Sequence, residues 1–81
     1  MEPVYTVYVL ECNDGTYYTG FTQNFENRLK AHQNKEVSYT KNRLPVTVNF
    51  VGKFNNKKKA YDFERYLKSG SGVAFRNKRL I

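Results

Sequence analysis

The segment TVYVLECNDGTYYTGFT, residues 6–22, contains two runs rich in Val, Tyr and Thr on either side of Asn13-Asp14-Gly15. β-branched and aromatic residues that flank an Asn-Asp-Gly turn are typical of two antiparallel strands joined by a tight loop. The first run begins at residue 4, and the second extends to residue 22. We therefore predict a β-hairpin at the start of the chain.

The length of the hairpin loop decides which side chains share a face of the sheet. A two-residue Asp14-Gly15 turn would place Tyr8 and Tyr18 on opposite faces. A three-residue loop, with Gly15 in the left-handed conformation, pairs Tyr8 with Gly20 and places both tyrosines on one face. We predict the three-residue loop because it gathers the apolar surface that a helix can cover on the other face: Tyr5, Val7, Val9, Tyr17 and Phe21.

After the hairpin, the chain shows one helical pattern and one further strand pattern. Asn24 is a plausible N-cap for a helix over residues 25–33, with Phe25, Leu29 and His32 at helical spacing. Residues 34–45 are polar and basic, which indicates an exposed loop. Residues 46–54 alternate in β fashion and predict a third strand.

The C-terminal part predicts a second helix and a short terminal one. Asn55 or Asn56 would cap the second helix, and Ala60, Phe63 and Leu67 form its apolar stripe. The glycines of residues 70–72 would break that helix before a terminal helical segment over residues 73–80. We predict one domain, residues 1–81, with an α/β fold of the α+β type: a three-stranded antiparallel sheet flanked by two to three helices.

The basic residues are concentrated in the second half of the chain. Residues 1–34 carry a net charge of −2 and residues 35–81 a net charge of +9, which together give the +7 of the whole chain. Such a distribution is typical of a protein that binds a polyanion, since neutralised phosphates release counterions. Nucleic acid is the expected polyanion, although a charge run can also serve only to solvate helix faces.

Cysteine content and hydropathy limit the compartment. The single Cys12 cannot form an intramolecular disulfide, and there is no Cys/His cluster for zinc. The first residues lack the basic and apolar regions of a secretion signal, and no apolar run is long enough to cross a bilayer. We expect a cytoplasmic protein with no membrane association.

Glu64 lies between Ala60 and Leu67, at the flank of the apolar stripe of its helix. A carboxylate in that position needs a counter-charge. The sequence leaves two alternatives: an ion pair with a basic residue, or coordination of a hard divalent cation, which binds nucleases through one or two carboxylates.

Arg28 and His32 are four residues apart, so both side chains leave the same face of their helix. A guanidinium can bond two phosphate oxygens and offset the charge that develops during phosphodiester cleavage. Tyr8 and Tyr18 could serve as bases only if nearby cations favour the phenolate. Strand propensity alone would also place tyrosines at these two positions.

Taken together, Tyr8, Tyr18, Arg28, His32 and Glu64 resemble, in order and approximate spacing, the site of the GIY-YIG endonuclease superfamily. The resemblance covers nearly the whole chain and extends to Tyr39-Thr40-Lys41 and Leu44-Pro45-Val46, which look like the small stand-alone members. The two motif triplets of the family correspond here to Thr6-Val7-Tyr8 and Tyr18-Thr19-Gly20, and Thr6, Val7 and Thr19 depart from them. Val7 and Thr19 are β-branched strand residues that a strand tolerates, whereas Thr6 adds a side chain where the family has glycine.

The resemblance implies a DNA endonuclease with one divalent cation, Mg²⁺ or Mn²⁺. Glu64 would hold the cation, Arg28 would stabilise the developing charge, and Tyr8, assisted by Tyr18 or His32, would activate the attacking water. Contacts to the DNA backbone, without sequence reading, are expected from the following residues: Tyr39, Lys41, Arg43, Lys57, Lys58, Lys59 and Asn77.

Two other functional classes fit the same sequence. One is a non-catalytic nucleic-acid-binding module that keeps the fold and the basic surface. The other is a protein-interaction adaptor whose charge is incidental. A carboxylate that faces phosphate would repel it, so Glu64 favours the enzyme unless it pairs with a basic residue away from the tyrosines. A targeting protein partner is a further expectation for a nuclease of this size.

Overall fold

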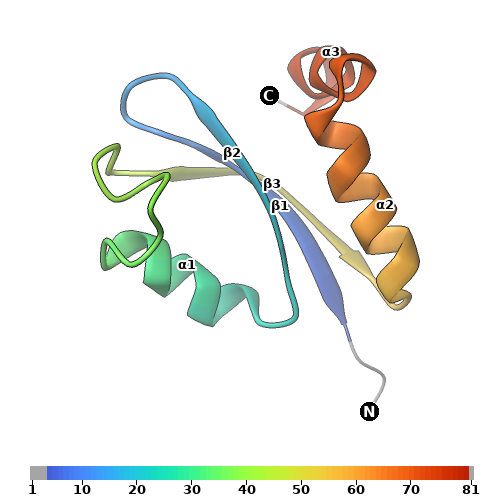
Figure 1. The fold of residues 1–81 in the computed structure, drawn as a ribbon, viewed down its shortest axis with the longest axis horizontal. Helices are drawn as coiled ribbons and strands as arrows, with labels where there is room; N and C mark the ends of the chain where they lie inside the picture. The colour runs from blue at the N-terminus through green and yellow to red at the C-terminus, as the bar shows by residue number, and fades with distance from the viewer. Residues whose placement is uncertain (1–3, 81) are drawn as a thin grey trace.

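The computed structural model describes residues 4–80, and it confirms the expected α+β class. A three-stranded antiparallel sheet with strand order β2-β1-β3 separates α1 from α2 and α3 (Figure 1). The elements are β1 (Tyr5–Glu11), β2 (Tyr17–Thr22), α1 (Phe25–Gln33), β3 (Thr47–Phe54), α2 (Lys57–Lys68) and α3 (Gly70–Arg79).

The hairpin has the predicted three-residue loop. Tyr8 pairs with Gly20 and Leu10 with Tyr18, and the Cys12 N–H donates to the Thr16 carbonyl across the loop. Gly15 has φ +83°, a left-handed conformation that glycine adopts at little cost. The prediction that Tyr8 and Tyr18 share a face is therefore confirmed, and their ring centroids lie 6.1 Å apart.

The main apolar core lies on the opposite face of the sheet, where α2 packs. Val7 and Val9 of β1 and Ala60 and Leu67 of α2 are fully buried there. The strand alternation predicted Tyr5, Tyr17 and Phe21 on this face, and the structure confirms it. Further aromatic side chains complete the surround of the core: Phe50, Phe54, Phe63 and Phe75.

Asparagine side chains cap the N-termini of α1 and α2. Asn24 accepts a hydrogen bond from the Asn27 N–H at the start of α1, and Asn56 accepts one from the Lys59 N–H at the start of α2. The sequence predicted the first cap and left Asn55 and Asn56 open for the second. The structure selects Asn56.

The prediction that residues 70–72 separate two helices was wrong. Ser69 ends α2 and caps α3, since its side chain accepts a hydrogen bond from the Gly72 N–H. The glycines therefore form the first turn of α3. Glycine is needed there because a Cβ on Gly72 would overlap the Tyr66 carbonyl and lie 2.7 Å from Leu67 Cα.

Across residues 4–80, no helix combines the length and the apolar character that crossing a membrane requires.

Candidate active site

Tyr8 of β1 is completely buried on the face of the sheet that α1 covers. Its ring packs against Phe25 and Tyr18, and its hydroxyl lies 3.0 Å from Nε2 of His32. Burial raises the pKa of the Tyr8 phenol well above its ordinary value, and the neighbouring Tyr18 adds to this, whereas the charge of Arg28 opposes it. At neutral pH, Tyr8 is therefore a protonated phenol.

Gly20 of β2 makes room for the Tyr8 side chain. A Cβ at position 20 would overlap the hydroxyl end of Tyr8 and lie 2.7 Å from its Cε1 atom. Tyr8 cannot swing aside at low cost because Phe25, Tyr18 and His32 pack around it. The glycine of the second motif triplet thus fits the tyrosine of the first.

We expect Gly20→Ala to lower the free energy of unfolding by about 1–3 kcal/mol, since overpacking forces buried side chains out of place. Chemical denaturation measures this loss. Gly70→Ala is the control, because a Cβ at position 70 meets no atom within 4 Å. Equal stability of the two variants would contradict the close approach of Tyr8 to Gly20.

His32 is also completely buried, and it connects Tyr8 to the loop after α1. Its Nδ1 lies 2.7 Å from Oγ1 of Thr40, a residue with no exposed surface. Burial and the charge of Arg28 lower the pKa of His32, so its imidazole is neutral at pH 7. The family resemblance included Thr40 within Tyr39-Thr40-Lys41, but sequence reasoning assigned it no role in the site because it lies in a loop segment without periodicity.

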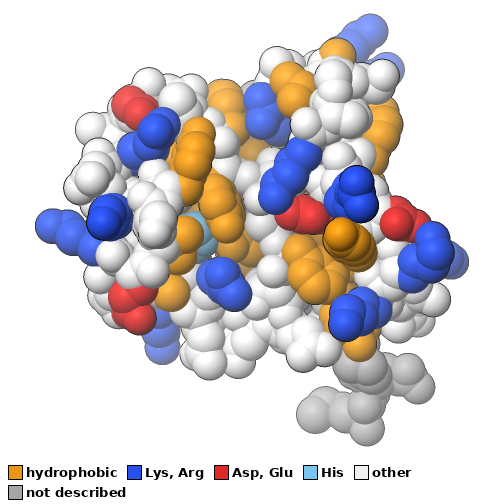
Figure 2. Space-filling view, in the orientation of Figure 1, with side chains coloured by type: hydrophobic (Ala, Val, Ile, Leu, Met, Phe, Trp, Pro, Cys, Tyr) orange, Lys and Arg blue, Asp and Glu red, His pale blue; other side chains and the backbone are white. Residues whose placement is uncertain are grey.

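A groove runs along the outer edge of β2, which we call the β2 groove. It consists of three adjoining hollows that together are lined by all six residues of β2. Figure 2 shows basic side chains on both sides of an apolar strip in the middle of this face. The charged residues that line the groove are Arg28, Lys57, Glu64, Lys68 and Arg76.

Glu64 lines the middle hollow together with Tyr18 and Gly20. Its side chain is 13% exposed and forms an ion pair of 2.5 Å with Lys68 of the next helical turn. Lys68 lines the adjoining hollow, beside Tyr18. The carboxylate is therefore paired, as one of the two alternatives predicted, but it is paired at the edge of the tyrosine site.

Arg28 lies at the other end of the β2 groove, and its side chain is exposed. It shares its hollow with Lys57, which also lines the hollow of Glu64. The fold thus places Tyr18, Arg28 and Glu64 along one groove, with Tyr8 and His32 buried behind the Tyr18 ring. The centroid of that ring is 4.8 Å from that of His32.

The predicted nucleic-acid-binding residues divide into two groups. Tyr39 and Lys57 line the β2 groove. The other five lie outside the groove as the structure describes it over residues 4–80: Lys41 is exposed on the loop, Arg43 bonds Asp14, Lys58 pairs with Asp62, Lys59 lies beside the end of β3, and Asn77 accepts hydrogen bonds from Arg76. Lys68 is a groove cation that sequence reasoning missed.

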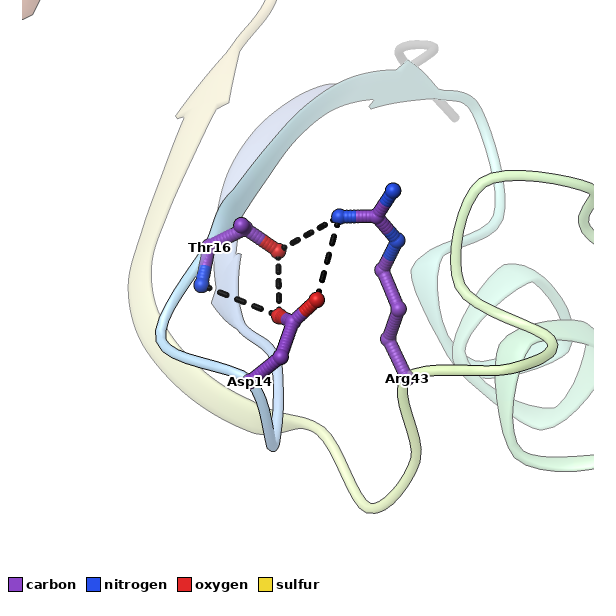
Figure 3. Close-up of polar contacts among 3 residues, drawn as sticks. All are labelled: Asp14, Thr16 and Arg43. Atoms are coloured by element: carbon purple, nitrogen blue, oxygen red, sulfur yellow. Dashed lines mark hydrogen bonds and ion pairs between the residues drawn. The ribbon is translucent and has the colours of Figure 1, made fainter.

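Arg43 has a structural role that the sequence did not predict. Its Nη1 donates to Oδ2 of Asp14 at 3.2 Å and to Oγ1 of Thr16 at 3.1 Å, which ties the loop after α1 to the hairpin turn (Figure 3). Hydrogen bonds from Thr16 and the charge of Arg43 lower the pKa of Asp14. The same guanidinium lies 4.3 Å from the centre of the Tyr39 ring. Arg43 therefore holds in place the segment that carries Thr40.

Comparison with known proteins gives a consistent assignment. Residues 4–77 match the family described as the GIY-YIG catalytic domain. The UPF0213 protein of Bacillus licheniformis is 45% identical over 62 residues, which are 75% of this chain and 64% of the relative. The UPF0213 protein of Clostridium perfringens is 44% identical over 63 residues, which are 76% of this chain and 68% of the relative. The match to the first relative thus spans just under two thirds of its length.

A solved structure has the same fold. The solution NMR structure of the UPF0213 protein from Bacillus halodurans superposes with a TM-score of 0.61 at 31% identity, and the match covers 95% of this chain and 86% of that chain. The names of these UPF0213 proteins state no activity.

Proposed function

The chain belongs to the GIY-YIG catalytic-domain family, and from that premise we propose that it is a DNA endonuclease that hydrolyses phosphodiester bonds with one divalent cation. The observation that carries this proposal is the position of Glu64. A nearly buried carboxylate lines a groove that is otherwise bordered by basic residues, next to the motif tyrosine Tyr18. A surface that served only to bind phosphates would gain nothing from a negative charge there.

A single carboxylate such as Glu64 is typical of a Mg²⁺ or Mn²⁺ site that water and substrate complete, and not of a site whose ligands all come from the protein. Within residues 4–80, no three His, Cys, Asp or Glu side chains cluster as ligands. Magnesium in nucleases is held by one or two carboxylates, with water and substrate phosphate oxygens completing its shell. Lys68, whose side chain is 55% exposed, can move away from Glu64 when a cation binds. The cation would supply Lewis-acid stabilisation of the phosphate.

The remaining chemistry belongs to side chains around the groove. The attacking water forms the new P–O bond while the bond to the leaving oxygen breaks, and Arg28 offsets the charge that develops on the phosphate. We assign the proton of the water to the buried pair, which the water reaches when the Tyr18 ring moves aside: the proton passes to the Tyr8 oxygen as the Tyr8 proton passes to Nε2 of His32, 3.0 Å away. His32 then releases its extra proton to solvent, as its lowered pKa favours, and the leaving oxygen takes a proton from solvent. This relay does not require an ionised phenol, whose formation burial opposes.

The basic residues of the β2 groove would hold the sugar-phosphate backbone. Arg28 and Lys57 lie toward one end of the groove, and Lys68 and Arg76 toward the other. Phosphate contacts position a nucleic acid and carry no sequence information. A protein partner would then select the target.

The alternative is a non-catalytic nucleic-acid-binding module on the same fold. The observation in its favour is the ion pair between Glu64 and Lys68, which neutralises the carboxylate in the absence of a cation. The two functions differ in whether a divalent cation displaces Lys68.

Cleavage of plasmid, single-stranded and branched DNA tests the proposal. We expect products with Mg²⁺ or Mn²⁺, none with chelator, and a loss of about 100-fold or more in Arg28→Ala, which lacks the cation beside the developing charge. Lys30→Ala is the matched control, because Lys30 is an exposed cation on the same helix that does not line the groove as described over residues 4–80. Salt-sensitive binding without cleavage of any substrate would instead support the binding module.

A further inference from the structure

Tyr8, His32 and Thr40 form a chain of buried polar side chains that joins three segments of the fold. Tyr8 comes from β1, His32 from α1 and Thr40 from the loop that follows α1. None of the three has exposed surface. Each polar atom must therefore find its hydrogen-bond partner inside the protein, because an unpaired buried donor is costly.

One direction of hydrogen bonding satisfies every donor of these three side chains. The Tyr8 hydroxyl donates to Nε2 of His32 at 3.0 Å, and the Nδ1–H of His32 donates to Oγ1 of Thr40 at 2.7 Å. The Thr40 hydroxyl then donates to the Val37 carbonyl, at the longer distance of 3.5 Å. This series of hydrogen bonds starts at the Tyr8 phenol and ends at the Val37 carbonyl.

The opposite direction leaves the Tyr8 hydrogen with a poorer acceptor than His32. If Thr40 donated to Nδ1, the histidine would carry its proton on Nε2 and donate to the Tyr8 oxygen. The Tyr8 hydrogen would then have to turn to the neighbouring Tyr18 hydroxyl, a side-chain hydrogen-bond partner that contributes to the raised pKa of Tyr8 but lies outside the well-formed hydrogen bonds of residues 4–80. In the favoured direction each hydrogen keeps the partner that the structure gives it, and the weakest contact is the one from Thr40 to Val37.

We infer that Thr40 is a positioning residue that holds His32 in the Nδ1–H tautomer, so that Nε2 faces Tyr8 as an acceptor. A neutral imidazole has one N–H, and the partner of one ring nitrogen decides the role of the other. Thr40 touches neither DNA nor the reacting atoms in this scheme. Its contribution to cleavage rests on the proposed function, whereas its effect on the tautomer does not.

The chain contains a single histidine, so the tautomer can be read without ambiguity from ¹⁵N NMR of histidine-labelled full-length protein. We expect wild type to show a protonated Nδ1 and an unprotonated Nε2. In Thr40→Val, which keeps the shape but cannot accept from Nδ1–H, the tautomer ratio should shift toward Nε2–H by at least about tenfold. Thr40→Ser, which keeps the hydroxyl, should retain the wild-type spectrum.

The same variants separate this inference from the nuclease proposal. In cleavage assays, Thr40→Val should lower kcat by about tenfold or more with KM unchanged, and Thr40→Ser should restore kcat. A wild-type spectrum with the proton on Nε2, or an unchanged tautomer in Thr40→Val, would overturn the inference whatever the activity. The expected tautomers in a protein that cleaves no DNA would support the role of Thr40 and contradict the nuclease.

Discussion

Glu64→Gln is expected to abolish metal-dependent cleavage, with a loss of about 100-fold or more under conditions where wild type is active. Glutamine keeps the size and shape of the side chain but removes the charge that would hold the cation. The neighbouring Lys68 then has no carboxylate to pair with, so DNA binding at low salt should be unchanged or stronger. Initial cleavage rates and filter binding over a range of salt concentrations measure the two effects.

Asp62→Asn is the matched control for this variant. Asp62 lies on the same helix and also pairs with a lysine four residues away, but its side chain is 59% exposed and does not line the β2 groove as described over residues 4–80. Asp62→Asn should unfold within about 1 kcal/mol of wild type, because an exposed ion pair contributes little. Glu64→Gln should remain folded, because the Lys68 that loses its partner is 55% exposed and can turn to solvent. Retained cleavage in Glu64→Gln would remove the carboxylate from the mechanism.

Gly72→Ala is expected to have the largest effect on stability. Its Cβ would overlap the Tyr66 carbonyl, and backbone cannot move aside as a side-chain terminus can. We expect a loss of about 3 kcal/mol or more, toward the upper end of the effect of overpacking, because α3 must either detach from α2 or distort the last turn of α2. Thermal and denaturant unfolding, with far-UV circular dichroism as the signal, would measure it.

Gly70→Ala provides the comparison within the same helical turn. Position 70 is open, and alanine has the higher helix propensity, so this variant should be neutral or slightly stabilising. Similar unfolding midpoints for the two alanine variants would show that the junction between α2 and α3 relaxes at little cost, contrary to the packing described above.

Local rules were sufficient to predict the hairpin and α1. The Asn13-Asp14-Gly15 loop specifies a register through Gly15, and the register determines that Tyr8 faces Gly20. The bounds of α1 follow from Asn24 and a regular apolar spacing. These features depend on residues near one another in sequence.

The parts that could not be predicted depend on contacts between distant segments. Thr40 reads as a polar loop residue, and only the return of the loop across α1 buries it against His32. Arg43 reads as a surface cation, yet it reaches the hairpin turn 29 residues away. The glycines at the start of α3 read as helix breakers, because no pattern shows that Gly72 meets the Tyr66 carbonyl.

Among residues 4–80, the outer edge of β2 pairs with no other strand, which has a consequence for self-association. An exposed strand edge offers free N–H and C=O groups to any similar strand, and proteins commonly guard such edges with charge. Here the edge lies in a groove bordered by Arg28, Lys57, Lys68 and Arg76. Two copies that approached edge to edge would bring these cations together, so the charges that attract a polyanion also discourage aggregation through β2.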